Sequence, residues 1–387
     1  MVKKVIRIIL LNIFSLFPLD SRKIIFESNS EIKDNSKALF LKILDLGVNS
    51  KYKIIWPVEN PKECKDAFKE YKNVSFVKKS KSGSSSLLFL YHCCTAKYCF
   101  YTHNPLGQRT REGQRKVFLT HGTPIKDTRG MFWPPYENTD IISTSEFAAY
   151  LRCKTFGGGD DVVRLLGFPR NDFLFKTDKG TEEYFDKIKK SKFIIWLPTF
   201  KRHNISVKRR DFDEDKNSDI SILSPGFMEK LNNYLKAKDI LLLIKYHPSQ
   251  NLDYVSLKSY SNIITLTNDQ LEKNNVDLYS LMGKSDALIT DFSSVYIDYL
   301  LVNKPIGFEL GDYKSYKNGR GFIVDNPLDF MPGEKIKSPG DLYTFIDNIF
   351  SGVDKYEEER IKLRNKMHKY VDGDSSERVL RYFELIN

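Results

Sequence analysis

The 387-residue sequence predicts an α/β protein built on parallel β-sheets. Short apolar runs typical of buried strands alternate along the chain with segments whose apolar residues recur at helical spacing. Several of these runs end in a turn that carries a histidine, a serine or an arginine. Ligands of open parallel sheets bind at the carboxyl ends of the strands, where these turns would lie. The chain is long enough for two domains, each with its own core.

The first 19 residues place Lys3, Lys4 and Arg7 before an apolar run. The run is shorter than the roughly 20 residues of a transmembrane helix. It resembles the core of a signal peptide, but no small-residue cleavage site follows, because Asp20 comes next. Two interpretations of residues 1–19 remain open: an amphipathic helix that lies on a membrane surface, and an ordinary first helix buried in the protein.

Residues 20–190 are expected to form an N-terminal Rossmann-like domain. Its strands are short runs rich in β-branched and aromatic residues, each bounded by polar turn residues. A helix over 37–46 follows the first strand, and a charged helical segment over 176–191 leads to the second domain. The strands are predicted at 24–26, 52–56, 74–77, 98–101, 116–120, 140–143 and 162–166.

His121 is the first candidate functional residue. It follows the strand at 116–120 in a turn where Gly122 permits close approach of the backbone and Pro124 fixes the direction of the chain. His121 is therefore expected at the carboxyl end of its strand, where a ligand would bind. A structural histidine is the alternative, but the glycine–proline turn at this edge favours a functional role.

A second polar turn, at 167–172, follows the strand at 162–166 and opens a helix. Arg170 in this turn is a candidate contact for an anionic ligand. The alternative is a purely structural turn in which Asn171 or Asp172 caps the helix.

Residues 191–387 restart the strand pattern and are expected to form a C-terminal Rossmann-like domain with closing helices. Residues 311–321 are rich in Tyr, Gly and Asp and are expected to form an irregular loop or a lid. Two helices are expected to close the chain. The other elements are predicted as strands at 193–197, 240–245, 263–266, 287–290 and 305–308 and as helices at 224–237, 277–282 and 295–302.

The stretch from 285 to 305 combines a strand, a polar turn and a helix. Asp291 ends the strand, and Ser293 and Ser294 are expected in the first turn of the helix at 295–302. Free backbone N–H groups and the helix dipole at this point suit a phosphate or a diphosphate. The alternative is that Asp291 or Ser293 only caps the helix, with no ligand.

His247 is a second histidine in a proline turn, expected at the same sheet edge as the serine pair. A loop histidine that packs or caps is the alternative. In the charged segment 207–217, Asp211, Asp213 and Asp215 alternate as metal-binding carboxylates can, but a solvated loop explains them better.

The composition limits the classes of binding partner and indicates the redox state of the cysteines. Lys and Arg exceed Asp and Glu by 61 to 50, and the resulting net charge of +11 attracts nucleic acid, anionic lipid or phosphorylated substrates. Nucleic acid is not expected, because no zinc-finger spacing, RNA-binding signature or long basic block is present. The five cysteines fit reduced thiols better than disulfides. Cys93, Cys94 and Cys99 lack the paired spacing of a metal site.

Six motifs follow one another along the chain: HGTPIK from His121, GFPRND from Gly167, LPTFKR from Leu197, KYHP from Lys245, ITDFSSVYIDYLLVNKPIGF from Ile289 and YVDGDSSERV from Tyr370. Together they resemble the CDP-glycerol glycerophosphotransferase family, whose members prime and polymerise wall teichoic acids and some capsules. The resemblance spans roughly residues 115–380. Glu27 and Asp34-Asn35 weakly resemble the N-terminal part of the family.

The resemblance implies a GT-B-like architecture, in which two Rossmann-type domains face each other across a cleft, the first for the acceptor and the second for CDP-glycerol. His121 and His247 match the family's two essential histidines. Asp291, Ser293 and Ser294 match its cradle for the nucleotide diphosphate. Lys201 departs from the family, where many members have arginine. Further substrate contacts are expected from Gly122, Thr123, Arg170, Thr199, Lys201, Lys245 and Arg378.

The implied reaction transfers glycerol phosphate from CDP-glycerol to a hydroxyl of a lipid-linked or polymeric acceptor, with release of CMP. No cofactor is expected and no metal ligand is assigned. A histidine with a pKa near ~6.5 can accept the proton of the hydroxyl. His121 is expected to be this base, and His247 is expected to stabilise the transferring phosphate, a role in which Arg378 could also add positive charge.

A lipid-linked acceptor implies a cytoplasmic protein held peripherally on the inner face of the bacterial plasma membrane, by residues 1–19 and the basic surface. Three alternatives remain. The donor could be CDP-ribitol, the protein could be a GT-B glycosyltransferase or epimerase that uses a UDP-sugar, or it could be a basic scaffold without catalysis.

Overall fold

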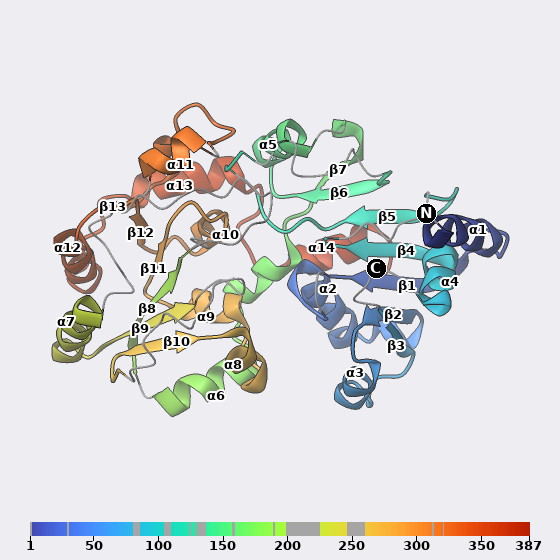
Figure 1. Ribbon diagram of the computed structural model, residues 1–387, viewed down its shortest axis with the longest axis horizontal. Coiled ribbons are helices and arrows are strands. Elements are labelled where there is room, and N and C mark those ends of the chain that lie inside the picture. Colours follow the sequence, from blue (N-terminus) through green and yellow to red (C-terminus); the bar gives the residue numbers. More distant parts are fainter. Residues whose placement is uncertain are drawn as a thin grey trace. The chain divides into compact units, whose positions relative to one another are not determined.

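The structure consists of two compact units, each with a parallel sheet of its own (Figure 1). Unit 1 comprises Met1–His121, Trp133–Asp172 and Asp374–Asn387, and unit 2 comprises Gly122–Phe132 and Phe173–Gly373. The computed structural model describes residues 2–28, 31–79, 86–103, 110–123, 125–127, 129, 137–156, 159–188, 190–198, 225–245, 260–311, 313–319 and 321–387.

Among the described residues, the unit 1 sheet has seven parallel strands in the order β3-β2-β1-β4-β5-β6-β7. The chain moves outward from β1 in one direction and then from β4 in the other, which is the doubly wound Rossmann order. The predicted strands are confirmed, as β1 (Asp20–Glu27), β2 (Lys53–Val58), β3 (Val74–Lys78), β4 (Ala96–Tyr101), β5 (Arg115–Phe118), β6 (Asp140–Ser143) and β7 (Val163–Leu165). The helices are α1 (Val2–Phe14), α2 (Asp34–Asp45), α3 (Pro61–Ala67), α4 (Leu87–Thr95), α5 (Glu146–Phe156) and α14 (Ser375–Tyr382).

Helices cover both faces of this sheet. Successive residues of a strand point to opposite faces. Ile24 and Phe26 of β1 therefore pack in one core with residues of α2 and α14, whereas Ile25 packs in a second core with residues of α1 and α4. Burial on both sides explains why the strands read as nearly continuous apolar runs in the sequence.

The closing helix α14 belongs to unit 1, although the sequence analysis assigned all residues beyond 191 to the second domain. Val379 and Leu380 are fully buried in the same core as Ile24 of β1. The carboxylate of Asp172 fixes the start of the helix, because it accepts the backbone N–H groups that follow Asp374, each at 2.8 Å. Asp172 thus caps the distant helix α14, whereas the sequence analysis considered it as a cap for the helix that its own turn opens.

Among the described residues, the unit 2 sheet has six parallel strands in the order β10-β9-β8-β11-β12-β13, again the Rossmann order. Its core contains Ile194 and Trp196 of β8 with residues of α7 and α12. The strands are β8 (Lys192–Leu197), β9 (Ile240–Lys245), β10 (Ile263–Leu266), β11 (Ala287–Thr290), β12 (Ile306–Glu309) and β13 (Glu334–Ile336), of which the sequence did not predict β13. The helices are α6 (Lys179–Ile188), α7 (Pro225–Ala237), α8 (Asn268–Lys273), α9 (Leu278–Lys284), α10 (Val295–Tyr299), α11 (Tyr313–Gly319), α12 (Pro339–Phe350) and α13 (Glu357–Met367).

The helix after the serine pair is shorter than predicted. The α-helix α10 ends at Tyr299, and Leu300–Val302 form a 3-10 turn. Asn303 closes this turn in the left-handed conformation, with φ of 48°. Asparagine tolerates that conformation, and Pro305 prevents the helix from continuing. The expected helix over 295–302 is therefore a short α-helix followed by a tighter turn.

The expectation of an irregular loop over 311–321 is wrong, because α11 occupies most of this segment. The ring of Tyr316 in α11 lies 4.5 Å from the ring of Phe292, and Phe322 packs against both. These contacts bury aromatic side chains of a segment that the sequence pattern had indicated as a loop.

The interpretation of the N-terminal segment as a first helix packed in the protein is confirmed in part, and its binding to a membrane surface stays a prediction. One side of α1 packs beside α4, with Leu10, Leu11 and Phe14 against the second core of unit 1 (Figure 1). The other side leaves Ile9 and Ile13 about half exposed, at 52% and 47%. Among the helices that the structure describes, none has both the length and the apolar run that a membrane crossing requires.

Candidate active site

The carboxyl edge of the unit 1 sheet gathers the first group of candidate site residues. The strand order reverses between β1 and β4, and open α/β sheets bind ligands at such a reversal. Glu27 is the last residue of β1 and pairs with Tyr101, the last residue of β4. His103 follows two residues later, and His121 follows the neighbouring strand β5. The topology therefore places both histidines at the edge where a ligand would bind.

His121 lies in a turn with two unusual backbone conformations. Thr120 has φ of 58° and Gly122 has φ of 123°, in regions that glycine adopts most readily. The side-chain amide of Asn35 holds this turn, because its Nδ2 donates to the carbonyl oxygens of Leu119 at 3.1 Å and Thr120 at 3.0 Å. The predicted glycine turn is confirmed, and α2 supplies the residue that fixes it.

The protonation state of His121 follows from its surroundings. Its Nδ1 lies 3.3 Å from the backbone oxygen of Thr102, which can only accept a hydrogen bond. Nδ1 therefore carries the proton of the neutral ring, and Nε2 is the basic nitrogen. Burial and, to a smaller extent, the neighbouring His103 lower the pKa of His121 to about 4, against the opposing effect of Asp34. The ring is neutral at physiological pH and able to accept a proton.

Asp34 and Arg170 form an ion pair close to this histidine. Nη1 of Arg170 donates to Oδ1 of Asp34 at 2.6 Å, and the backbone N–H of Arg170 donates to Oδ1 of Asn35 at 3.0 Å. Burial would raise the pKa of Asp34, but Arg170 and then His121 hold it below its usual value. Arg170 thus has a carboxylate partner within its own unit, and its contact with a substrate anion stays a prediction.

Asn35 and His103 are site residues to which the sequence analysis gave no role. Asn35 was noted with Asp34 only as a weak family resemblance. His103 gave a clearer signal, because it follows its strand closely, as His121 does. Its ring stacks on that of His121 with centroids 4.7 Å apart and planes at 15°.

Thr123 is buried beside the His121 turn, and Arg378 makes hydrogen bonds to other residues of the protein. Nε of Arg378 donates to the carbonyl oxygen of Leu166 at 3.1 Å, and its Nη2 lies 3.2 Å from Oγ of Ser375. Both residues stay predictions as substrate contacts.

The carboxyl edge of the unit 2 sheet carries the second group. Its strand order reverses between β8 and β11, and Thr290 at the end of β11 donates its hydroxyl to the carbonyl oxygen of Leu197 at the end of β8, at 2.8 Å. Asp291 therefore follows directly at the reversal. Lys245 ends β9, on the other side of β8. Thr199, Lys201 and His247 lie outside the described residues.

Asp291, Ser293 and Ser294 form a turn before α10 rather than its first helical turn. Oδ1 of Asp291 accepts the backbone N–H of Ser293 at 3.1 Å, and Oγ of Ser293 accepts that of Val295 at 3.5 Å. Ser294 is the N-cap residue, and its side chain makes no capping hydrogen bond. The expected placement of the serines inside the helix is wrong by about one residue, because Asp291 bends the chain before the helix begins.

Residues from distant parts of unit 2 anchor this turn and its helix. Nε2 of the buried His368 donates to the carbonyl oxygen of Ile297 at 2.8 Å. The hydroxyl of Tyr279 donates to Asp298 at 2.7 Å. Phe292, between Asp291 and Ser293, packs on Tyr316 of α11. The position of the turn is thus set by contacts well beyond the motif.

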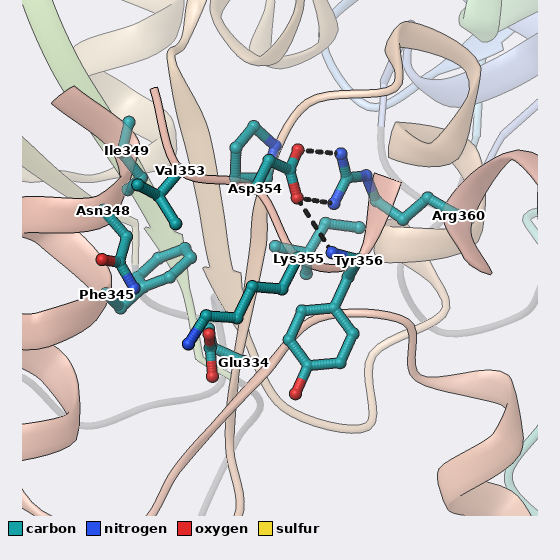
Figure 2. A pocket seen from close by; sticks show the side chains of 11 residues that line it. Glu334, Phe345, Asn348, Ile349, Val353, Asp354, Lys355, Tyr356 and Arg360 are labelled. Atoms are coloured by element: carbon teal, nitrogen blue, oxygen red, sulfur yellow. Dashed lines mark hydrogen bonds and ion pairs between the residues drawn. The ribbon is translucent and has the colours of Figure 1, made fainter. Parts of the chain in front are cut away.

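A small open hollow in unit 2 is lined by residues other than these, among them Glu334, Tyr356 and Arg360 (Figure 2). Ile306 and Glu334, which line it, begin β12 and β13, so the hollow lies at the amino edge of the sheet. Its buried Arg360 is bound to both carboxylate oxygens of Asp354. Because that charge is neutralised and the edge is the wrong one for this fold, the hollow is not the active site.

No group of three or more His, Cys, Asp or Glu side chains that could hold a metal ion occurs among the described residues. Asp211, Asp213 and Asp215 lie outside them.

Two doubly wound sheets with polar turns at their carboxyl edges define an α/β protein of GT-B-like class. The solved structure of the wall teichoic acid polymerase TagF has this fold: its TM-score with this protein is 0.73 at 21% identity, over 99% of this chain and 97% of that chain. A UDP-N-acetylglucosamine 2-epimerase from Listeria monocytogenes shares the fold more distantly, with a TM-score of 0.51 at 10% identity over 95% of this chain and 98% of that one.

A family model described as CDP-Glycerol:Poly(glycerophosphate) glycerophosphotransferase matches residues 9–385. The teichoic acid glycerol-phosphate primase of Bacillus subtilis (strain 168) is 30% identical over 256 residues, which are 65% of this chain and 59% of that protein. The teichoic acid poly(glycerol phosphate) polymerase of Bacillus spizizenii is 27% identical over 406 residues, covering 96% and 94%. The chain therefore belongs to the CDP-glycerol:poly(glycerophosphate) glycerophosphotransferase family. The expected family and the expected GT-B-like fold are confirmed.

Proposed function

We propose that this protein transfers glycerol phosphate from CDP-glycerol to a hydroxyl of a lipid-linked or polymeric acceptor, with release of CMP, in the synthesis of a teichoic acid or a capsule polymer. Family membership and the similarity to a primase and a polymerase of teichoic acid support this activity. The chain spans 59% of the primase's length and 94% of the polymerase's. The observation that carries the proposal is a half-buried, neutral His121 at the carboxyl edge of a Rossmann-type sheet, with Nε2 as its basic nitrogen.

His121 would act as the general base. An acceptor hydroxyl attacks the phosphorus atom next to glycerol, and its proton passes to Nε2 of His121 as the new P–O bond forms. The bond between that phosphorus and the oxygen of CMP breaks, and CMP leaves with the electron pair. The imidazolium that results is stabilised by the carboxylate of Asp34, whose interaction with His121 favours the charged ring.

The donor would bind at the carboxyl edge of unit 2. The backbone N–H groups around Ser293 and Ser294 and the free side chain of Ser294 suit the oxygens of a diphosphate. Lys245 would add positive charge from the end of β9. We propose, from the sequence, that His247 stabilises the transferring phosphate. Substrate contacts are proposed on the same basis for Thr199 and Lys201.

The test is CMP release from CDP-glycerol by His121→Ala and His247→Ala. Loss of a general base or of a transition-state contact lowers turnover by roughly 10²- to 10⁴-fold. His92→Ala is the matched control, because His92 is also half-buried in unit 1 but packs on Tyr91 in α4. Turnover close to wild type in either variant would remove that histidine from its role.

CDP-ribitol is the second candidate donor. A teichoic acid poly(ribitol-phosphate) polymerase of Bacillus spizizenii is 27% identical over 399 residues, which are 95% of this chain and 57% of that protein. Thermal unfolding with CDP-glycerol, CDP-ribitol and UDP-N-acetylglucosamine separates the donors, since a ligand at 100 times its Kd stabilises the folded state by about 2.7 kcal/mol. Stabilisation by the UDP-sugar alone would contradict a polyol-phosphate transferase.

The proposal extends to peripheral binding on the inner face of the bacterial plasma membrane. Large apolar side chains of the N-terminal segment and the start of α4 are exposed, and the net charge is +11. We define the α1–α4 apolar patch as Ile6, Ile9, Ile13, Leu16, Phe17, Leu87 and Leu88.

Ile9→Ser with Ile13→Ser tests this binding better than a deletion, because Leu10, Leu11 and Phe14 of the same helix pack in the core. Sedimentation with anionic liposomes should fall for this double variant. Leu328→Ser is the control, since Leu328 is 40% exposed in unit 2. Unchanged sedimentation of the double variant would exclude the patch as the membrane contact.

A further inference from the structure

His103 is held firmly at the reversal point of the unit 1 sheet. Its backbone N–H donates to Oε2 of Glu27 at 3.3 Å, and its Nδ1 lies 2.9 Å from Oγ1 of Thr102. Glu27 is itself buried at the end of β1 and pairs with Nζ of Lys79 at 3.0 Å. The imidazole of His103 is therefore attached to a fixed part of the sheet rather than to a free loop.

The contact between the two imidazoles is face to face. Their centroids are 4.7 Å apart and their planes differ by 15°. The N–H groups of parallel rings lie in the ring planes, so neither ring can donate a hydrogen bond to the other. The stack can therefore orient His121 but cannot pass a proton along. It also covers one face of the His121 ring.

Charged groups around the pair balance one another. Asp34 faces both rings and is paired with Arg170, and Glu27 faces His103 and is paired with Lys79. Each carboxylate thus has its own cation. Among the described residues, the hydrogen bond of Nδ1 to Thr102 and the stacked ring of His103 are then the contacts that orient the ring of His121.

We propose that His103 is a positioning residue for His121: its ring fixes the plane of the catalytic imidazole and excludes water from one face of it. This inference rests on the proposed function, in which His121 is the general base. His103 itself touches neither the acceptor nor the donor in this role. A neutral aromatic ring of similar size at position 103 would therefore serve, whereas a polar side chain without a ring would not.

Three variants separate the ring from its hydrogen bond. His103→Phe keeps a flat ring and loses the bond to Thr102, His103→Gln keeps a polar group and loses the ring, and His103→Ala loses both. We expect kcat of CMP release to fall roughly 10- to 100-fold in the Gln and Ala variants, because a misplaced base costs about this much. The Phe variant should stay within about threefold of wild type, and KM for CDP-glycerol should change by less than about twofold in all three.

The pH dependence of kcat/KM separates positioning of His121 from a merely structural role of His103, because a structural role would not change the acid limb. In the Gln and Ala variants water reaches His121, so the acid limb of kcat/KM should move up from about pH 4 toward the ordinary value of ~6.5. The Phe variant keeps the burial that is the larger cause of the lowered pKa of His121 and loses only the smaller effect of the His103 ring, so its acid limb should stay well below ~6.5. His92→Ala should leave both kcat and the acid limb unchanged.

Two outcomes would overturn the inference: wild-type kcat and acid limb in His103→Ala, or a loss in His103→Phe as large as in His103→Gln. His121→Ala is measured in parallel. If that variant stays active, the proposed base is wrong. If it is inactive while His103→Gln behaves as wild type, only the positioning role is wrong.

Discussion

The two sheets have the same Rossmann-type strand order, but the turns at their carboxyl edges are held in different ways. In unit 1, the turn that carries His121 is held by Asn35, whose Nδ2 bonds to a backbone oxygen 85 positions along the chain. In unit 2, the turn that carries Ser293 is held by Asp291, only two positions away. The first site depends on long-range contacts for its shape, whereas the second has a local shape and depends on long-range contacts only for its anchoring.

The largest change in the free energy of unfolding is expected from a variant that breaks a long-range contact of unit 1. Asp34→Asn keeps the size of the side chain and tolerates the φ of 61° at this position, but it removes the carboxylate that pairs with Nη1 of Arg170. The two side chains are 12% and 14% exposed, so loss of the carboxylate should cost about 2 kcal/mol, less than the roughly 3–5 kcal/mol of a fully buried pair. Urea unfolding should show this loss of stability.

The pH dependence of folding stability provides a second test of Asp34→Asn. The pKa of Asp34 is lowered in the folded protein, so its ionised form contributes stability at neutral pH that is lost as the pH falls through its folded pKa. The Asn variant should lack this part of the acid sensitivity. A stability within about 0.5 kcal/mol of wild type at pH 7 would contradict the assignment of Asp34 as the partner of Arg170.

The pH profile of the wild-type protein tests the environment of His121. Because burial lowers the pKa of His121 to about 4, kcat/KM should stay level from about pH 8 down to about pH 5 and fall only near pH 4. The neutral ring also contributes stability above the unfolded value of ~6.5 that is lost as the pH falls toward about 4. An acid limb near 6.5 would mean that His121 is hydrated or is not the base.

The smallest expected effect on stability lies at the serine turn of unit 2. Ser294→Ala removes a hydroxyl that makes no capping hydrogen bond, so stability should change by less than about 0.5 kcal/mol. If this hydroxyl contacts the diphosphate of the donor, KM for CDP-glycerol should rise by roughly tenfold. Steady-state kinetics measures this change, with Ser338→Ala, at the start of α12, as a serine control that affects stability alone. An unchanged KM would remove Ser294 from the donor site.

Much of the fold could be predicted from the sequence because buried parallel strands are continuous apolar runs. The predicted strands from 24–26 to 305–308 are all present in the structure. α11 was missed because tyrosine and glycine indicate a loop when their packing is unknown, and the contact of Tyr316 with Phe292 is visible only in the tertiary structure. β13 was missed because its sequence, Glu-Lys-Ile, contains a single apolar residue and so no apolar run marks it.

The candidate site was predicted in part. His121 and the serine pair could be found because each follows its strand within a short motif. Asn35, Asp34 and His103 received no role, since nothing close to them in the sequence shows that they meet the turn after β5. The stack of His103 on His121 joins residues that follow two different strands.

The sequence by itself determined the alternation of strands and helices, the family and the turns that carry chemistry, because these depend on the spacing of apolar residues and on local backbone preferences. Only the tertiary structure decided that α14 completes unit 1 and that Asn35, Asp34 and His103 surround His121. Such contacts join chain segments far apart in sequence, and the burial that gives His121 its lowered pKa arises only when those segments pack together.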